Sequence, residues 1–235
     1  IRLSLVGSEM CIRDRFEGLL PPVVIGPTFA IRKPAVAVFT LDDYVAAGIM
    51  TADQAATLRA AVASRANILV AGGTSTGKTT LTNALLAEVA KGSDRVVIIE
   101  DTRELQCRAE NLVSMRTKDG VATLSDLVRS SLRLRPDRIP IGEVRGAEAL
   151  DSLKAWGTGH PGGLGTIHAG SGIGALRRLE QLIQEAVVTV PRALIAETID
   201  LVAVLSGRGS ARRLAELARV CLLYTSDAAD ERSSV

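Results

Sequence analysis

Eight consecutive residues of the chain have the types and the spacing that bind phosphate. The segment Gly72-Gly73-Thr74-Ser75-Thr76-Gly77-Lys78-Thr79 fits the pattern G-x-x-x-x-G-K-[ST]. In such a loop the glycines let backbone N–H groups surround phosphate oxygens, a lysine reaches the β- and γ-phosphates, and a hydroxyl ligates magnesium. We expect Lys78 and Thr79 to take the last two roles, with Thr80 beside them in the first turn of a helix. A predicted strand before the loop and a predicted helix after it favour a nucleotide site over a chance glycine turn.

Glu100 and Asp101 end an apolar segment at 95–99. Because the carboxyl ends of parallel strands meet at one edge of a sheet, Glu100 is a candidate to orient a water molecule beside the phosphate loop, and Asp101 and Arg103 are lesser candidates for the same site. Taken alone, an acidic strand end is also typical of a solvated turn. The order of the motifs along the chain favours the functional role.

Glu143 follows a second apolar segment, at 138–142. Here the carboxylate is expected to hold magnesium through water, because magnesium keeps part of its hydration shell. Pro140 lies inside this predicted strand. Since proline has no N–H to donate, the strand is either bent there or paired on one side only at that residue.

The two histidines of the chain, His160 and His168, lie close together in a glycine-rich segment at 158–171. No third histidine or nearby cysteine completes a metal site, which disfavours that interpretation. A glycine-rich turn followed by a strand that ends in His168 fits a loop that senses phosphate. An imidazole there can donate a hydrogen bond to the γ-phosphate.

Predicted strands and helices alternate through most of the chain. Thr40 and Thr51 have the capping pattern of helix starts, the second opening a helix to about residue 65. This alternation predicts an α/β fold with a mainly parallel sheet covered by helices, and a nucleotide at the carboxyl ends of its strands. The strands are expected at 67–71, 95–100, 111–115, 138–142, 163–168 and 200–205, and the further helices at 80–90, 124–134, 146–156, 173–185 and 191–199.

Composition limits the class of protein. A net charge of +2 is too small to indicate nucleic-acid binding, and three cysteines without paired spacing indicate neither disulfides nor a zinc site. Prolines and charges interrupt the most apolar stretch, so any membrane attachment is expected to be peripheral.

The chain divides into four parts. Residues 1–15 and 221–235 resemble translated sequencing-adapter sequence, and we interpret them as a non-native leader and tail. Residues 16–39 are interpreted as the end of an N-terminal α+β domain and a linker, with a strand at 28–32. Residues 40–220 are the predicted nucleotide-binding domain.

In their order, these motifs resemble the hexameric traffic ATPases of bacterial type II and type IV secretion, in particular the conjugative-transfer (TrbB-like) ATPases. Residues 72–79 are similar to the Walker A loop, 99–102 to the aspartate box, 141–146 to the unusual Walker B motif and 159–169 to the histidine box. The resemblance covers residues 16 to about 220 and implies a RecA-like P-loop core. Ser75 stands where the family often has glycine.

The resemblance also implies a function. Members of that family form six-subunit rings that hydrolyse ATP with Mg²⁺ at their subunit interfaces. By this resemblance, the expected catalytic residues are Lys78, Glu100, Glu143 and His168. Such a motor acts at the cytoplasmic face of the inner membrane with secretion or pilus proteins as partners, and sequence-specific nucleic-acid binding is not expected. Arg32 is then a candidate finger that reaches a nucleotide in the neighbouring subunit.

Two other functions remain open at this point. A nucleic-acid translocase with the same core should carry a basic channel or stacking aromatic residues, and only 3% of this chain is aromatic. A catalytically silent nucleotide-binding fragment would show the same loop without turnover.

Overall fold

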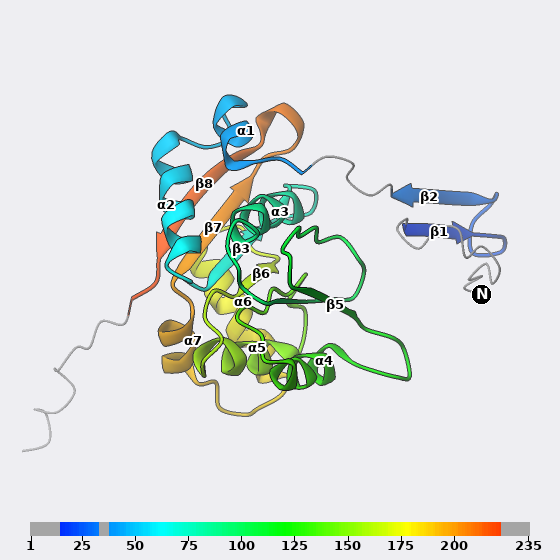
Figure 1. Cartoon of the computed structure of the whole chain (residues 1–235). Helices are drawn as coiled ribbons and strands as arrows, with labels where there is room; N and C mark the ends of the chain where they lie inside the picture. Colours follow the sequence, from blue (N-terminus) through cyan, green and yellow to red (C-terminus); the bar gives the residue numbers. More distant parts are fainter. Residues whose placement is uncertain (1–14, 33–37, 222–235) are drawn as a thin grey trace, which may run out of the picture. The chain divides into compact units, whose positions relative to one another are not determined.

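The computed structural model describes residues 15–32 and 38–221, and the chain divides into two compact units, Ile1–Val38 and Phe39–Val235 (Figure 1). In the first unit, β1 (Arg15–Leu19) pairs antiparallel with β2 (Thr28–Arg32), and Phe16 lies opposite Ile31. The strand predicted at 28–32 is therefore confirmed. The proposed foreign segments, apart from Arg15 and Cys221, lie outside the described residues, and that interpretation stays a prediction.

The second unit is built on a mainly parallel sheet. β3 (Ile68–Gly72) lies between β6 (Leu164–Ile167) and β7 (Leu201–Ser206), parallel to both. β4 (Val96–Glu100) and β5 (Leu112–Arg116) form a second parallel pair. The edge strand β8 (Arg213–Arg219), which runs antiparallel to β7, was not predicted from the sequence.

Residues 138–142 connect the two groups of strands. The Ile141 N–H donates to Leu164 O at 2.7 Å on the β6 side, and the Gly142 N–H donates to Ile99 O at 2.8 Å on the β4 side. Pro140 has no N–H, but its carbonyl accepts from Ile99 at 2.9 Å. The segment forms single bridges to its neighbours where a regular strand was predicted, because the proline interrupts the ladder.

Helices cover both faces of this sheet. On one face α1 (Leu41–Ala46), α2 (Ala52–Ala63) and α3 (Lys78–Val89) pack on Ile68 and Val70. On the other face α4 (Leu124–Ser131), α5 (Glu148–Gly157), α6 (Gly172–Gln184) and α7 (Arg192–Thr198) pack on Leu69 and Ala71. Two short 3-10 turns, Leu132–Leu134 and Gly209–Ala211, complete the unit.

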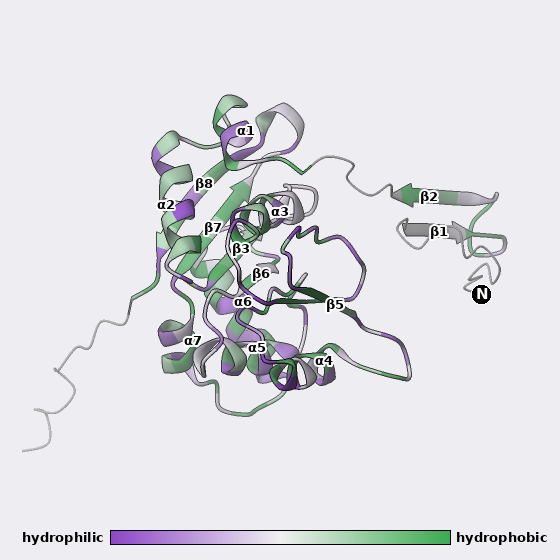
Figure 2. Ribbon diagram, viewed as in Figure 1, coloured by the Kyte–Doolittle hydropathy of each residue, from purple (hydrophilic) through white to green (hydrophobic). Residues whose placement is uncertain are grey.

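The alternation of Ile68, Leu69, Val70 and Ala71 between two cores shows why β3 reads as an unbroken apolar run. Figure 2 shows the same hydrophobic character along β3 and β7. The predicted capping boxes at Thr40 and Thr51 are both present. Within the described part of the chain, no helix is long and apolar enough to cross a membrane. The predicted α/β fold with a mainly parallel sheet is confirmed.

Candidate functional site

The phosphate loop connects β3 to α3 and has the backbone geometry that close approach to an anion requires. Gly77, the N-cap of α3, has a φ of +97°, and Ser75 has a φ of +64°. At Ser75 this left-handed conformation costs about 1–2 kcal/mol relative to a glycine. Gly72 has no room for a Cβ, because Thr76 Oγ1 and Leu205 O crowd that position. The backbone path of the loop therefore depends on glycine at positions 72 and 77.

Lys78 lies at the start of α3 and is largely buried. Its Nζ donates to Gly72 O at 3.0 Å and to Gly73 O at 3.1 Å, so the loop's own carbonyls hold the ammonium group at the loop. Thr76 Oγ1 also donates to Gly73 O, at 2.9 Å. The unpaired N–H groups and the positive end of α3 point to the same place.

Glu104 is the acidic residue that contacts Thr79, and sequence reasoning did not select it. Thr79 Oγ1 donates to Glu104 Oε2 at 3.1 Å. Asn83 holds the loop around Glu104, because its Nδ2 donates to Glu104 O at 3.1 Å and its Oδ1 accepts from Gln106 N at 2.9 Å. The only available signal was a third carboxylate, four residues after Glu100.

Glu100 ends β4 as predicted, and its side chain is only 3% exposed. Its Oε2 accepts from the backbone N–H groups of Glu104, at 3.2 Å, and Leu105, at 3.0 Å. Burial raises the pKa of Glu100, and these two hydrogen bonds oppose that rise. The contacts of Glu100 brace the loop that carries Glu104, and its predicted role in orienting water stays a prediction.

Glu143 and His168 meet beside Lys78. His168 Nε2 lies 2.9 Å from Glu143 Oε1, a contact that is an ion pair only when the imidazole is protonated. The two ring nitrogens of His168 lie 3.4 and 3.5 Å from Lys78 Nζ. Glu143 Oε1 is buried, and no described donor reaches it with hydrogen-bond geometry, so the oxygen keeps acceptor capacity. Its other oxygen accepts from Arg145, a contact that raises the pKa of the guanidinium.

The structure thus brings Lys78, Glu143 and His168 together, with Thr79 next to Lys78 in the chain, and His160 makes a different contact. His160 Nδ1 lies 2.8 Å from Pro136 O. Among the described residues, no three His, Cys, Asp or Glu side chains cluster closely enough to hold a metal ion. Thr74 is exposed in the loop, and Thr80 is half-buried in the first turn of α3. Arg32 ends β2 in the first unit, and its reach to a neighbouring subunit stays a prediction.

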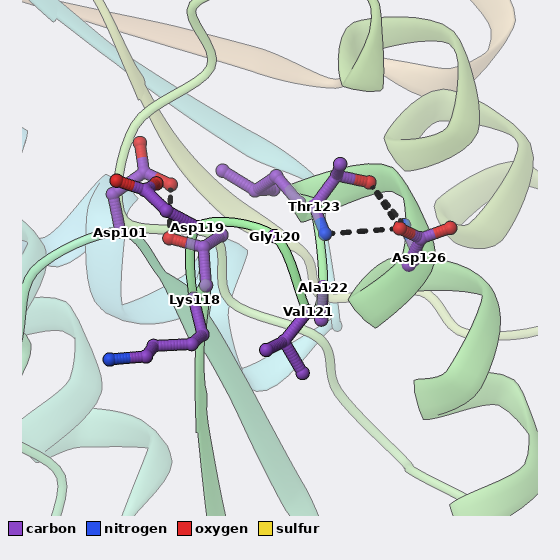
Figure 3. A pocket seen from close by; sticks show the side chains of 10 residues that line it. Asp101, Lys118, Asp119, Gly120, Val121, Ala122, Thr123 and Asp126 are labelled. Atoms are coloured by element: carbon purple, nitrogen blue, oxygen red, sulfur yellow. Dashed lines mark hydrogen bonds between the residues drawn. The ribbon is translucent and has the colours of Figure 1, made fainter.

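A hollow of about 440 Å³ lies beside Asp101, and no phosphate-loop residue lines it (Figure 3). Two of the acidic side chains that line the hollow accept hydrogen bonds from other residues of the chain. Asp101 Oδ1 accepts from Thr117 Oγ1 at 3.0 Å, and Asp126 Oδ2 accepts from Thr123 Oγ1 at 2.6 Å as part of the cap of α4. The hollow is separate from the site built around Lys78.

The residues around the phosphate loop fit a magnesium nucleotide. Magnesium prefers oxygen ligands, and the Thr79 hydroxyl with the acceptor oxygen of Glu143 supplies that chemistry. Lys78 and the start of α3 supply the positive charge that a polyphosphate requires. At Gly72 and Gly77 a Cβ would collide with the protein's own atoms, so this path of the loop backbone requires glycine at both positions.

Comparisons with known proteins show which family the chain resembles. The family model described as "Type II/IV secretion system protein" matches residues 2–222. "Conjugal transfer protein TrbB" of Rhizobium radiobacter is 51% identical over 208 residues, which are 88% of this chain and 64% of that protein. "Type IV secretion system protein PtlH" of Bordetella pertussis is 35% identical over 252 residues, covering 91% of this chain and 73% of the relative.

Among solved structures, the VirB11 ATPase from the Brucella suis type IV secretion system, in complex with sulphate, is similar at 29% identity and a TM-score of 0.66. The match covers 88% of this chain and 70% of that one. The chain spans somewhat less than two thirds of the length of the TrbB relative.

Proposed function

Because this chain belongs to the type II/IV secretion system protein family, we propose that it is the motor part of a conjugative type IV secretion ATPase. The reaction is hydrolysis of ATP to ADP and phosphate at the phosphate loop. The name of the TrbB relative, a conjugal transfer protein, supports the conjugative role. Six subunits, activity at their interfaces and a place at the inner membrane with other secretion proteins belong to the same proposal.

The observation that carries the proposal is the meeting of side chains from separate segments at one loop. His168, after β6, lies within 3.5 Å of Lys78 Nζ and 2.9 Å from Glu143. Glu104, after β4, lies 3.1 Å from the Thr79 hydroxyl. A core held together by apolar packing alone does not require two carboxylates, an imidazole and an ammonium group at one sheet edge.

Each of these groups has a task in phosphoryl transfer to water. When bound, Mg²⁺ neutralises charge that develops on the β- and γ-phosphates. Thr79 and Glu143 would hold it, Glu143 through water, and the Lys78 ammonium group would stabilise the γ-phosphate oxygens. The imidazole of His168, beside Lys78, is in position to sense whether the γ-phosphate is still attached.

Two carboxylates compete for the role of orienting the attacking water. Sequence order selects Glu100, whereas the contact with Thr79 favours Glu104, because Thr79 lies next to the metal in this proposal. In the second arrangement Glu100 positions Glu104 through its two backbone hydrogen bonds. Arg32 stays a candidate to complete the site of a neighbouring subunit.

The test is ATP turnover per subunit measured against protein concentration, with mass determined by light scattering. The sample is this chain joined to the remaining segments of the Rhizobium radiobacter relative, beside the same chain with Lys78→Ala. We expect turnover per subunit to rise as a larger assembly forms and to vanish in Lys78→Ala. Nucleotide binding without turnover at any concentration would instead identify a silent binding module.

A further inference from the structure

Arg212 lies against the phosphate loop, although it is more than 130 residues away in sequence. A Cβ placed on Gly77 would be 3.0 Å from Arg212 Nε and 3.2 Å from its Cζ. Gly77 is the N-cap of α3 and directly precedes Lys78. The guanidinium of Arg212 therefore packs on the loop backbone, next to the point where an anion would sit.

The hairpin between β7 and β8 places Arg212 there. Leu205 of β7 lies opposite Gly72 of β3, so the hairpin begins beside the start of the phosphate loop. Gly207 turns the chain with a φ of +75°, and the carbonyl of Ala211 fills the space where a Cβ would stand. A residue other than glycine at 207 would displace this turn and, with it, the arginine that follows.

No described group accepts a hydrogen bond from the Arg212 side chain. Its Nε is buried without a partner, and no described carboxylate forms an ion pair with its guanidinium. The hydroxyl of Tyr44, a residue only 2% exposed, is a second buried polar atom without a described partner. Burial raises the pKa of Tyr44 to about 12, and the charge of Arg212 opposes that rise.

The surroundings of Arg212 call for an anion. A guanidinium beside Lys78 and the positive end of α3 is repelled by both, and a buried donor without an acceptor destabilises the fold. An arginine fork is well matched to a phosphate, which can accept two parallel hydrogen bonds. One bound phosphate group would offset the charge repulsion and would accept a hydrogen bond from the buried guanidinium donor.

The sheet order indicates which phosphate this is. β3 lies between β6 and β7, so His168 and Glu143 approach the loop from the β6 side and Arg212 from the β7–β8 side. In the proposed function, the first side holds the γ-phosphate, where bonds change. The opposite side faces the part of the nucleotide that ATP and ADP share.

We propose that Arg212 is a nucleotide-binding residue that holds the non-reacting phosphates of the bound nucleotide, with the α-phosphate as its main partner, from within the same subunit. The inference rests on the proposed function, since it requires a nucleotide at this loop. A contact made equally to ATP and ADP strengthens binding of both and leaves the chemical step unchanged. Arg212 thus differs in role from Lys78 and His168.

The experiment compares Arg212→Gln with Arg213→Gln in the full chain. Glutamine keeps much of the length that packs on Gly77, and Arg213 is the adjacent, exposed arginine, so the second variant has the same change in charge. Thermal unfolding without nucleotide establishes that each variant is folded. Calorimetric titration then gives the dissociation constants for ADP and for the non-hydrolysable analogue AMP-PNP with magnesium, beside wild type and Lys78→Ala.

We expect Arg212→Gln to weaken binding of both nucleotides about 10- to 100-fold and by equal factors, as for loss of a charge-assisted hydrogen bond. Arg213→Gln should stay within about twofold of wild type. Equal affinities for the two variants would overturn the role of Arg212 while leaving the nucleotide site intact. A loss confined to AMP-PNP would overturn the assignment to the shared phosphates. Absence of ADP binding by the wild type would remove the proposed function itself, and this inference with it.

Discussion

Replacement of Glu104 by glutamine separates the two carboxylates that compete for the attacking water. Glu104 Oε2 accepts from Thr79 Oγ1 at 3.1 Å, and a glutamine oxygen can keep that contact while it loses the negative charge. The backbone around Glu104 is held by Asn83 and Glu100, through bonds that do not involve the Glu104 side chain. The change therefore removes basicity and leaves the loop in place.

The size of the expected effect follows from the role. A positioned general base contributes about 10²- to 10⁴-fold to a rate, which corresponds to about 3–5 kcal/mol in the activation free energy. In the proposed role Glu104 acts on the attacking water, which plays no part in ADP binding, so ADP affinity should change by less than about threefold. The midpoint of thermal unfolding should stay within a few degrees, since the change is partly exposed and conserves shape.

The assay is steady-state phosphate release from Mg-ATP, with ADP binding and thermal unfolding measured on the same preparations. Glu100→Gln is the matched variant, because its amide oxygen can still accept from the N–H groups of Glu104 and Leu105. We expect Glu104→Gln to lose turnover and Glu100→Gln to retain most of it. The reverse result, with both proteins folded, would refute the geometric argument and establish the role that sequence order gives to Glu100.

Two further predictions concern the loop that carries Glu104. Asn83→Ala removes two hydrogen bonds, of 3.1 and 2.9 Å, from a residue that is only 4% exposed. Urea denaturation should show that the free energy of unfolding falls by about 1–3 kcal/mol. The same change at the exposed Asn111 should cost less than about 0.5 kcal/mol. Burial raises the pKa of Glu100 above its ordinary 4.5, so between that value and the raised pKa the folded state holds a proton that the unfolded chain releases, and stability falls as the pH rises. Glu100→Gln cannot ionise, so its stability relative to wild type should rise as the pH increases above about 4.5. A difference independent of pH would contradict the burial of a charge at this position.

Much of the fold follows from the sequence, because local signals and tertiary packing agree there. The apolar runs at 68–72 and 96–100 are strands buried on both faces, and the threonine caps start helices where the pattern predicts. β8 was missed for a physical reason. Its residues, Arg-Leu-Ala-Glu-Leu-Ala-Arg, are good helix formers, and pairing with β7 overrides that propensity.

The site was predictable where a residue ends a strand and less so where a loop determines its position. Lys78 and Thr79 begin α3, His168 follows β6, and Glu143 follows the bridged segment 138–142. Lys78, Glu143 and His168 meet at one edge of the sheet. Glu104 lies in a loop whose path depends on hydrogen bonds from Asn83 and Glu100, which no local pattern encodes. Arg212 directly precedes β8, which was not predicted as a strand, so its position beside the phosphate loop was not predicted either.

Hydrolysis of Mg-ATP by the full chain, compared with Lys78→Ala, tests most directly whether the phosphate loop is an ATPase site. Phosphate release is measured after both proteins are shown to be folded. We expect magnesium-dependent release by the wild type, and at least about a 100-fold lower rate when the Lys78 ammonium group is removed. Equal rates in the two proteins would contradict this expectation, since hydrolysis would then not depend on the loop. Tight ADP binding with no release would contradict the motor and leave a nucleotide-binding module.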